Sequence, residues 1–148
     1  MKRMLSGFVV LALLVSSQSH TTAANKTSNG TKKYVVFHAT GAFYSGDELA
    51  GTITIETTTG KVVSANLAVL DFFGNTVLAA FNGIPETLTG SASTEIFVGA
   101  ANSTVIALVI PSASLKGYAG GDLVPGPYES RWWSWDGIDP LVGGTLEP

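Results

Sequence analysis

The sequence predicts a single all-β domain, an antiparallel β-sandwich or barrel-like fold, preceded by a signal peptide. Two observations predict this class. After residue 33, apolar and polar residues alternate with a period of two over several short runs, which is typical of half-buried strands. Gly, Asn, Ser and Pro separate these runs at short intervals, as in sandwiches and barrels. The predicted parts are a signal peptide over residues 1–24, a flexible polar leader over 25–33 and the β-domain over 34–148.

The composition fits one domain with a core of ordinary size. The chain has 148 residues, of which 45% are hydrophobic and 13% are charged. These proportions exclude a disordered tail and a coiled coil. The sequence contains no Cys, which excludes a disulfide-stapled miniprotein and a zinc-thiolate domain. The fold must therefore be held by burial and strand pairing.

The first 24 residues have the pattern of a secretory signal peptide. Lys2 and Arg3 form a positive head, an apolar run over residues 4–15 follows, and small residues lead to Ala24. The apolar run of about twelve residues is too short to span a bilayer of about 30 Å as a helix. We expect cleavage after Ala24, or earlier after Ser19. The mature protein is then secreted, either extracellular or periplasmic, and has no membrane partner.

The charge of the predicted domain narrows the choice of partner. From Tyr34 onward only Lys61, Lys116 and Arg131 face all 11 carboxylates, a formal charge of −8. Such a surface repels phosphate backbones and anionic lipid headgroups. We therefore expect no nucleic acid and no membrane surface as a partner. The partner that we expect is therefore an extracellular polysaccharide or an envelope component.

The first three strands follow from the alternation of apolar residues. We expect their apolar residues to face the core and the intervening residues, many of them Thr, to face solvent. The residues Thr57–Gly60 join the second and third runs as a hairpin, with Gly60 adopting a positive φ. The inward positions predicted for the three strands are Phe37, Ala39, Gly41 and Phe43; Leu49, Gly51, Ile53 and Ile55; and Val63, Ala65, Leu67 and Val69.

Three further strands are predicted over Thr76–Phe81, Thr94–Ala100 and Val105–Ile110, the first of them after a turn at Gly74-Asn75. The last run has six consecutive apolar residues, so it does not alternate and should be a central strand covered on both faces. We expect Ile106 and Leu108 on one face and Val105, Ala107 and Val109 on the other, all largely buried.

Three stretches of the chain carry recognisable short motifs. They are the hairpin Gly51-Thr-Ile-Thr-Ile-Glu-Thr-Thr-Thr-Gly-Lys-Val-Val-Ser-Ala-Asn-Leu-Ala-Val69, the stretch Leu115-Lys-Gly-Tyr-Ala-Gly-Gly-Asp-Leu123 and the ending Asp139-Pro-Leu-Val-Gly-Gly-Thr-Leu146. These stretches resemble bacterial secreted all-β proteins of the kind that often carry a PEP-CTERM sorting tail. The resemblance covers about residues 34–148 and implies an exported all-β domain of unassigned biochemical role. The tail itself is absent after Glu147-Pro148, so we expect release rather than sorting.

Residues suited to catalysis or metal binding are sparse. His38 is the one His outside the signal peptide, and the sequence contains no Gly-x-Ser-x-Gly elbow, so a secreted hydrolase is an unfavoured alternative. Asp47-Glu48 at a turn and Glu56 on an outward strand face are expected to be solvated, whereas glycosidases need two carboxylates in a cleft. Asp136-Gly-Ile-Asp139 lacks the dense Asp/Asn alternation of a calcium loop. We predict no metal site and no cofactor.

The segment Tyr128–Asp136 contains all three Trp of the chain and gives the candidate ligand-binding residues. As a strand it would place Trp133 and Trp135 on one face and Trp132 on the other. Core packing, contact with a sugar polymer and contact with a protein are the alternatives. The leading hypothesis is an exported, non-catalytic β-domain that serves as a structural or binding module, and the alternative is a carbohydrate-binding module. The candidates are Arg131, Trp132, Trp133, Trp135 and Asp136.

Overall fold

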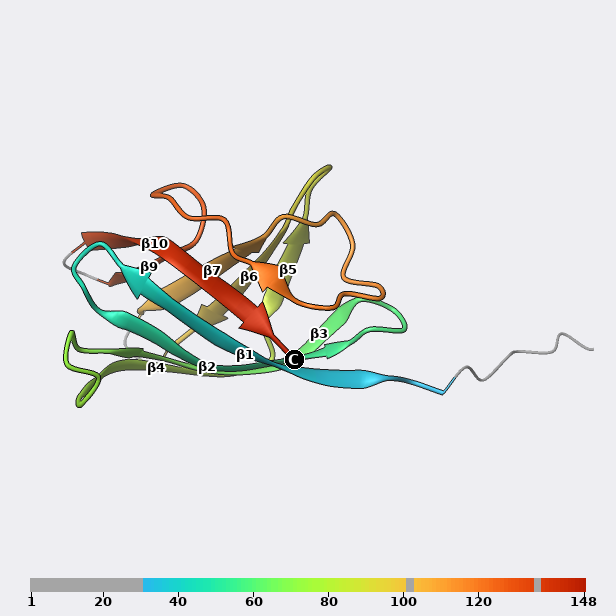
Figure 1. Ribbon diagram of the computed structural model, residues 1–148, viewed down its shortest axis with the longest axis horizontal. Coiled ribbons are helices and arrows are strands. Elements are labelled where there is room, and N and C mark those ends of the chain that lie inside the picture. Colours follow the sequence, from blue (N-terminus) through green and yellow to red (C-terminus); the bar gives the residue numbers. More distant parts are fainter. Residues whose placement is uncertain (1–30, 101–102, 135–136) are drawn as a thin grey trace, which may run out of the picture.

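The computed structural model describes residues 31–100, 103–134 and 137–148, and these ranges contain strands and no helix (Figure 1), so the all-β prediction is confirmed. Consequently, no helix in the described ranges is long and apolar enough to cross a membrane. The strands are β1 (Tyr34–Phe43), β2 (Glu48–Glu56), β3 (Lys61–Leu70), β4 (Val77–Gly83), β5 (Glu86–Thr89), β6 (Thr94–Gly99), β7 (Val105–Ile110), β8 (Gly121–Asp122), β9 (Arg131–Ser134) and β10 (Gly137–Glu147).

The strands form one antiparallel sheet that curls strongly into a half-barrel. Its order is β4-β3-β2-β1-β10-β9-β7-β6-β5, and β8 adds a short pair to β10. One half of the sheet is formed by β4, β3, β2 and β1, and the other by β9, β7, β6 and β5. Strand β10 belongs to both halves, because residues 137–140 pair with β9 and the rest of the strand pairs with β1. The curl brings β4 near β6 on the far side of the core. The fold thus has two ends, where the loops between strands gather.

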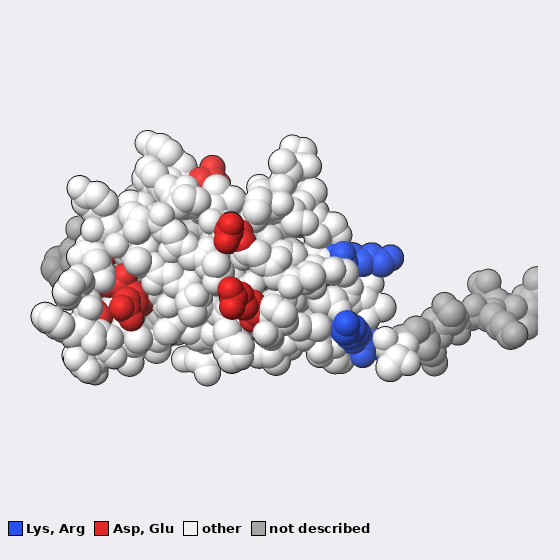
Figure 2. Space-filling model, in the orientation of Figure 1, with Lys and Arg blue, Asp and Glu red and all other residues white. Residues whose placement is uncertain are grey.

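The β2–β3 hairpin marks one end of the half-barrel. Gly60 has a φ of 81°, which confirms the predicted turn. The end of the leader is held here, because the Thr57 amide donates to the Lys33 carbonyl at 2.8 Å. Lys61 opens β3, and the Lys116 backbone packs against Gly60. On the face seen in Figure 2, the basic side chains lie at the end where β1 begins, while acidic ones lie over the middle and the opposite end.

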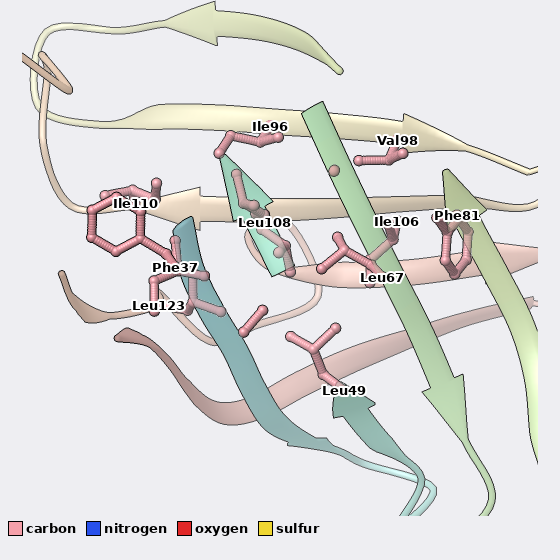
Figure 3. Packing of buried hydrophobic residues seen from close by; sticks show 14 of the residues in the cluster. Phe37, Leu49, Leu67, Phe81, Ile96, Val98, Ile106, Leu108, Ile110 and Leu123 are labelled. Atoms are coloured by element: carbon pink, nitrogen blue, oxygen red, sulfur yellow. The ribbon is translucent and has the colours of Figure 1, made fainter. Parts of the chain in front are cut away.

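Side chains from both halves of the curled sheet meet in one hydrophobic interior (Figure 3). Ile106, Leu108 and Ile110 of β7 point into it. Ala107 and Val109, on the opposite face, are also buried. The prediction of a central strand covered on both faces is therefore confirmed. Val105 is the exception: it is half-exposed, so the expectation that it is largely buried was wrong.

The register of β3 differs from the prediction by one residue at its start. Val62, not Val63, fills the core, and Val63 is half-exposed. A bulge explains the difference, because Ile55 pairs with Val62 whereas Thr54 pairs with Ser64. The extra residue shifts the alternation of the residues that precede it in β3. From Ala65 onward the predicted inward positions are buried.

Glu56 is buried rather than solvated, which corrects the expectation for this acid. Its relative exposure is 4%. Tyr34 is its cross-strand neighbour on β1, and Lys32 Nζ lies 3.8 Å from Glu56 Oε2. The chain that leads into β1 therefore covers this carboxylate, which alternation within β2 could not indicate.

Candidate functional site

Strand β9 separates the candidate tryptophans onto opposite faces of the sheet. Trp132 lies between Ile106 of β7 and Asp139 of β10, and Trp133 lies between Val105 and Ile138. The predicted separation of these two rings is confirmed. Trp135 and Asp136 lie outside the described residues. The two faces of β9 have different surroundings.

The outer face of the sheet is the one that points away from the hydrophobic interior. On this face, Trp133 and Arg131 belong to a packed layer. The Trp133 ring meets Phe97 of β6 edge to face, with centroids 6.5 Å apart. The Arg131 guanidinium lies 5.1 Å from the centre of the Trp133 ring, and it is ion-paired with Glu95 at 3.4 Å. Ala107 lies between Phe97 and Arg131 in register and is fully buried. This layer covers the outer face of β7, and a guanidinium occupies a ring face that a sugar would need.

On the inner face, Trp132 forms part of a pocket at the end of the half-barrel. Its ring packs edge to face against Phe43, with centroids 6.3 Å apart. The indole Nε1 donates to Asp139 Oδ2 at 3.3 Å. We call the hollow of about 440 Å³ beside it the end pocket. It is lined by Ser45, Asp47, Leu78, Trp132, Gly137, Ile138 and Asp139.

Asp139 is the centre of a hydrogen-bond network in the end pocket. The Ser45 hydroxyl donates to Oδ2 at 2.6 Å, and the Ser45 amide donates to Oδ1 at 3.2 Å. The same hydroxyl accepts a hydrogen bond from the Asp47 amide at 3.1 Å. These contacts join the turn after β1 to β10, and they fix the Asp139 carboxylate in one orientation. The Asp47 carboxylate lines the same pocket.

Two other hollows are formed by described residues. A groove of about 460 Å³ on the outer face has largely apolar walls, with Glu86 as its one charged residue. We call it the outer groove, and its lining residues are Ile84, Glu86, Leu88, Phe97, Gly99 and Val105. A smaller hollow of about 250 Å³ lies beside Tyr118 and Lys33, at the end marked by the β2–β3 hairpin. Burial, and then the charge of Asp122, raise the pKa of Tyr118.

The remaining candidates do not gather at the end pocket. His38 is exposed on β1, where Thr52 and Glu147 are its cross-strand neighbours. Among residues 31–100, 103–134 and 137–148, no three His, Cys, Asp or Glu side chains are close enough together to hold a metal ion.

No pattern in the sequence predicts that Asp47 and Asp139 lie close together. The hydrogen bond that connects their segments spans 94 residues of sequence, from Ser45 to Asp139. Alternation within a strand cannot show which distant strand becomes its neighbour. Comparison of the chain with protein-family models, curated proteins and solved structures finds no match.

Proposed function

We propose that this protein is an exported, non-catalytic β-domain that binds a carbohydrate in the end pocket. Export is supported by the signal-peptide pattern of residues 1–24. The ligand is an extracellular polysaccharide or a sugar-bearing envelope component. The observation that carries the proposal is the position of Trp132 beside Asp139, Asp47 and Ser45 in one hollow.

The chemistry of the pocket suits a neutral, hydroxylated ligand. Sugar hydroxyls donate hydrogen bonds, and the carboxylates of Asp47 and Asp139 accept them. Trp132, Leu78 and Ile138 provide apolar surface for the C–H groups of a sugar ring. Binding sites of this kind combine a mainly apolar lining with a few placed polar groups. The contacts of Ser45 and Trp132 already hold Asp139, so little ordering is needed when a ligand binds.

A glycan array probed with the mature protein tests this proposal. We expect neutral glycans to bind, and we expect Asp47→Asn to weaken binding by about tenfold, because a charge-assisted hydrogen bond is lost. Glu86→Gln is the matched control, because it removes a carboxylate from the outer groove. An array without bound glycans would contradict the proposal. Loss of binding in Glu86→Gln alone would move the site to the outer groove.

A secreted hydrolase is the second candidate, because Asp47 and Asp139 line one pocket. Retaining and inverting glycosidases use two carboxylates about 5–10 Å apart. We favour binding without turnover, since both oxygens of Asp139 already accept hydrogen bonds from Ser45 and one also accepts from Trp132. Incubation of a bound glycan with the protein should release no new reducing ends. Release that Asp139→Asn abolishes would establish the hydrolase.

A further inference from the structure

Three exposed aromatic rings lie at the same end of the half-barrel as the end pocket. Tyr44, Phe72 and Phe73 have relative exposures of 81%, 65% and 76%. They come from the turn after β1 and from the loop between β3 and β4. We call these three residues the aromatic rim. Large apolar side chains that gather on a surface mark an interaction site more often than scattered ones do.

The aromatic rim is continuous with the end pocket. Tyr44 precedes Ser45 of the pocket, and its amide donates to the Pro140 carbonyl at 2.9 Å. Phe72 lies against Gly46, where an added Cβ would be 2.7 Å from the ring. Phe73 meets Phe72 edge to face, with centroids 5.2 Å apart. The rings therefore border the turn that supplies Ser45 and Asp47 to the end pocket.

The rings of Phe72 and Phe73 are presented by an ordered turn. Asp71 Oδ1 accepts hydrogen bonds from the amides of Asn75, at 2.8 Å, and Thr76, at 3.1 Å. The Gly74 amide donates to the Asp71 carbonyl at 2.7 Å. These bonds hold the loop that carries the two rings. A loop that is ordered before binding loses less entropy when a ligand arrives.

The charges around the aromatic rim favour a neutral partner. Asp47, Glu48 and Asp71 belong to the same two loops or border them, and the Glu48 carboxylate faces Gly74. Lys61 opens β3 and pairs with Glu56, which lies at the opposite end of β2 from Glu48, about 27 Å along the strand. Figure 2 shows basic side chains at that far end of the visible face. Carboxylates around aromatic rings repel phosphate and anionic lipid, but they accept hydrogen bonds from hydroxyl groups.

We propose, on the basis of the function proposed above, that the ligand is a neutral polysaccharide chain rather than a single sugar. One sugar unit occupies the end pocket beside Asp139 and Trp132. Neighbouring units of the chain make apolar contacts with the exposed rings of Tyr44, Phe72 and Phe73. The end pocket then recognises the class of ligand, and the aromatic rim selects chain length.

Titration calorimetry with neutral oligosaccharides of glucose, xylose, mannose and galactose, from one to six units, tests this proposal. We expect affinity for at least one series to rise about tenfold or more with length, as additional rings are contacted. The double variant Phe72→Ala/Phe73→Ala should lose this rise and keep the affinity for the shortest sugar that binds. Asp47→Asn should weaken binding at every length. Leu88→Ala is the matched control, because Leu88 is an exposed apolar residue of β5. It should change neither the affinity for the shortest sugar nor the rise of affinity with length.

The outcomes separate the two proposals. Binding that does not depend on length, or a rise that survives the double variant, would overturn the role of the aromatic rim and leave the end pocket as a sugar site. No binding by any series would overturn both proposals. Binding of phosphatidylcholine vesicles in place of sugars would assign the rim to a lipid surface. The single variant Tyr44→Ala is a second test that leaves the packing of Phe72 on Gly46 intact. Tyr44 is the most exposed ring of the aromatic rim, and its loss should also reduce the gain with length.

Discussion

Leu108→Ala should be among the most destabilising single substitutions in the domain. Leu108 is fully buried at the middle of β7, and Ile96 is its partner on β6. In the core, side chains from both halves of the sheet surround this region (Figure 3). Movement of a single strand therefore cannot fill the space that the Leu108 side chain leaves. Most of the volume removed should remain as a cavity.

The magnitude follows from the carbons removed. Leu to Ala deletes three buried carbons, worth about 0.8 kcal/mol each in transfer free energy. The cavity adds to this, which gives about 3–4 kcal/mol, within the range of about 2–5 kcal/mol for such substitutions. That loss is a large share of the roughly 5–15 kcal/mol that stabilises a domain.

Urea denaturation measures this loss as a lower midpoint at an unchanged slope. Val105→Ala is the matched control, because Val105 is an apolar residue of the same strand and is half-exposed. Its cost should be about 1 kcal/mol or less. Equal midpoints for the two variants would refute the argument, because they would mean that burial on β7 does not control stability.

Two further predictions concern the backbone and pH. Gly51→Ala should destabilise the domain by about 2 kcal/mol or more, because Gly51 has a φ of 138° and an added Cβ would clash with the Asn66 carbonyl oxygen. Gly143→Ala, where a Cβ meets nothing within 4 Å, should be close to neutral in the same denaturation assay, and a similar loss for both would contradict the prediction. The amides of Thr76 and Asn75 lower the pKa of Asp71 below its usual 3.8, so the turn is stabilised above that pH and loses this stabilisation as pH falls through the lowered pKa. The NMR shifts of these two amides should titrate with a midpoint below 3.8, which Asp71→Asn abolishes; a midpoint at or above 3.8 would contradict the assignment.

Most of the strand pattern could be predicted from the sequence, because alternation is a local property of the chain. The run Val105–Ile110 coincides with β7, and the predicted inward residues of the first two strands other than glycine are buried. The last strand was not predicted. Asp139-Pro140 and three glycines disfavour a strand by local preference, yet β10 pairs with β1, β8 and β9.

Alternation along a strand is enough to predict that Trp132 and Trp133 point to opposite faces. The neighbours of each ring, in contrast, depend on how distant strands pair. Pairing of β9 with β7 brings Trp133 to Phe97, and pairing with β10 brings Trp132 to Asp139. The meeting of Ser45 with Asp139 depends on the curl of the sheet, which joins segments 94 residues apart. Glu56 likewise lies close to Lys32, a residue outside its own strand. The physical reason is that local preference acts along the chain, whereas a site is built across it.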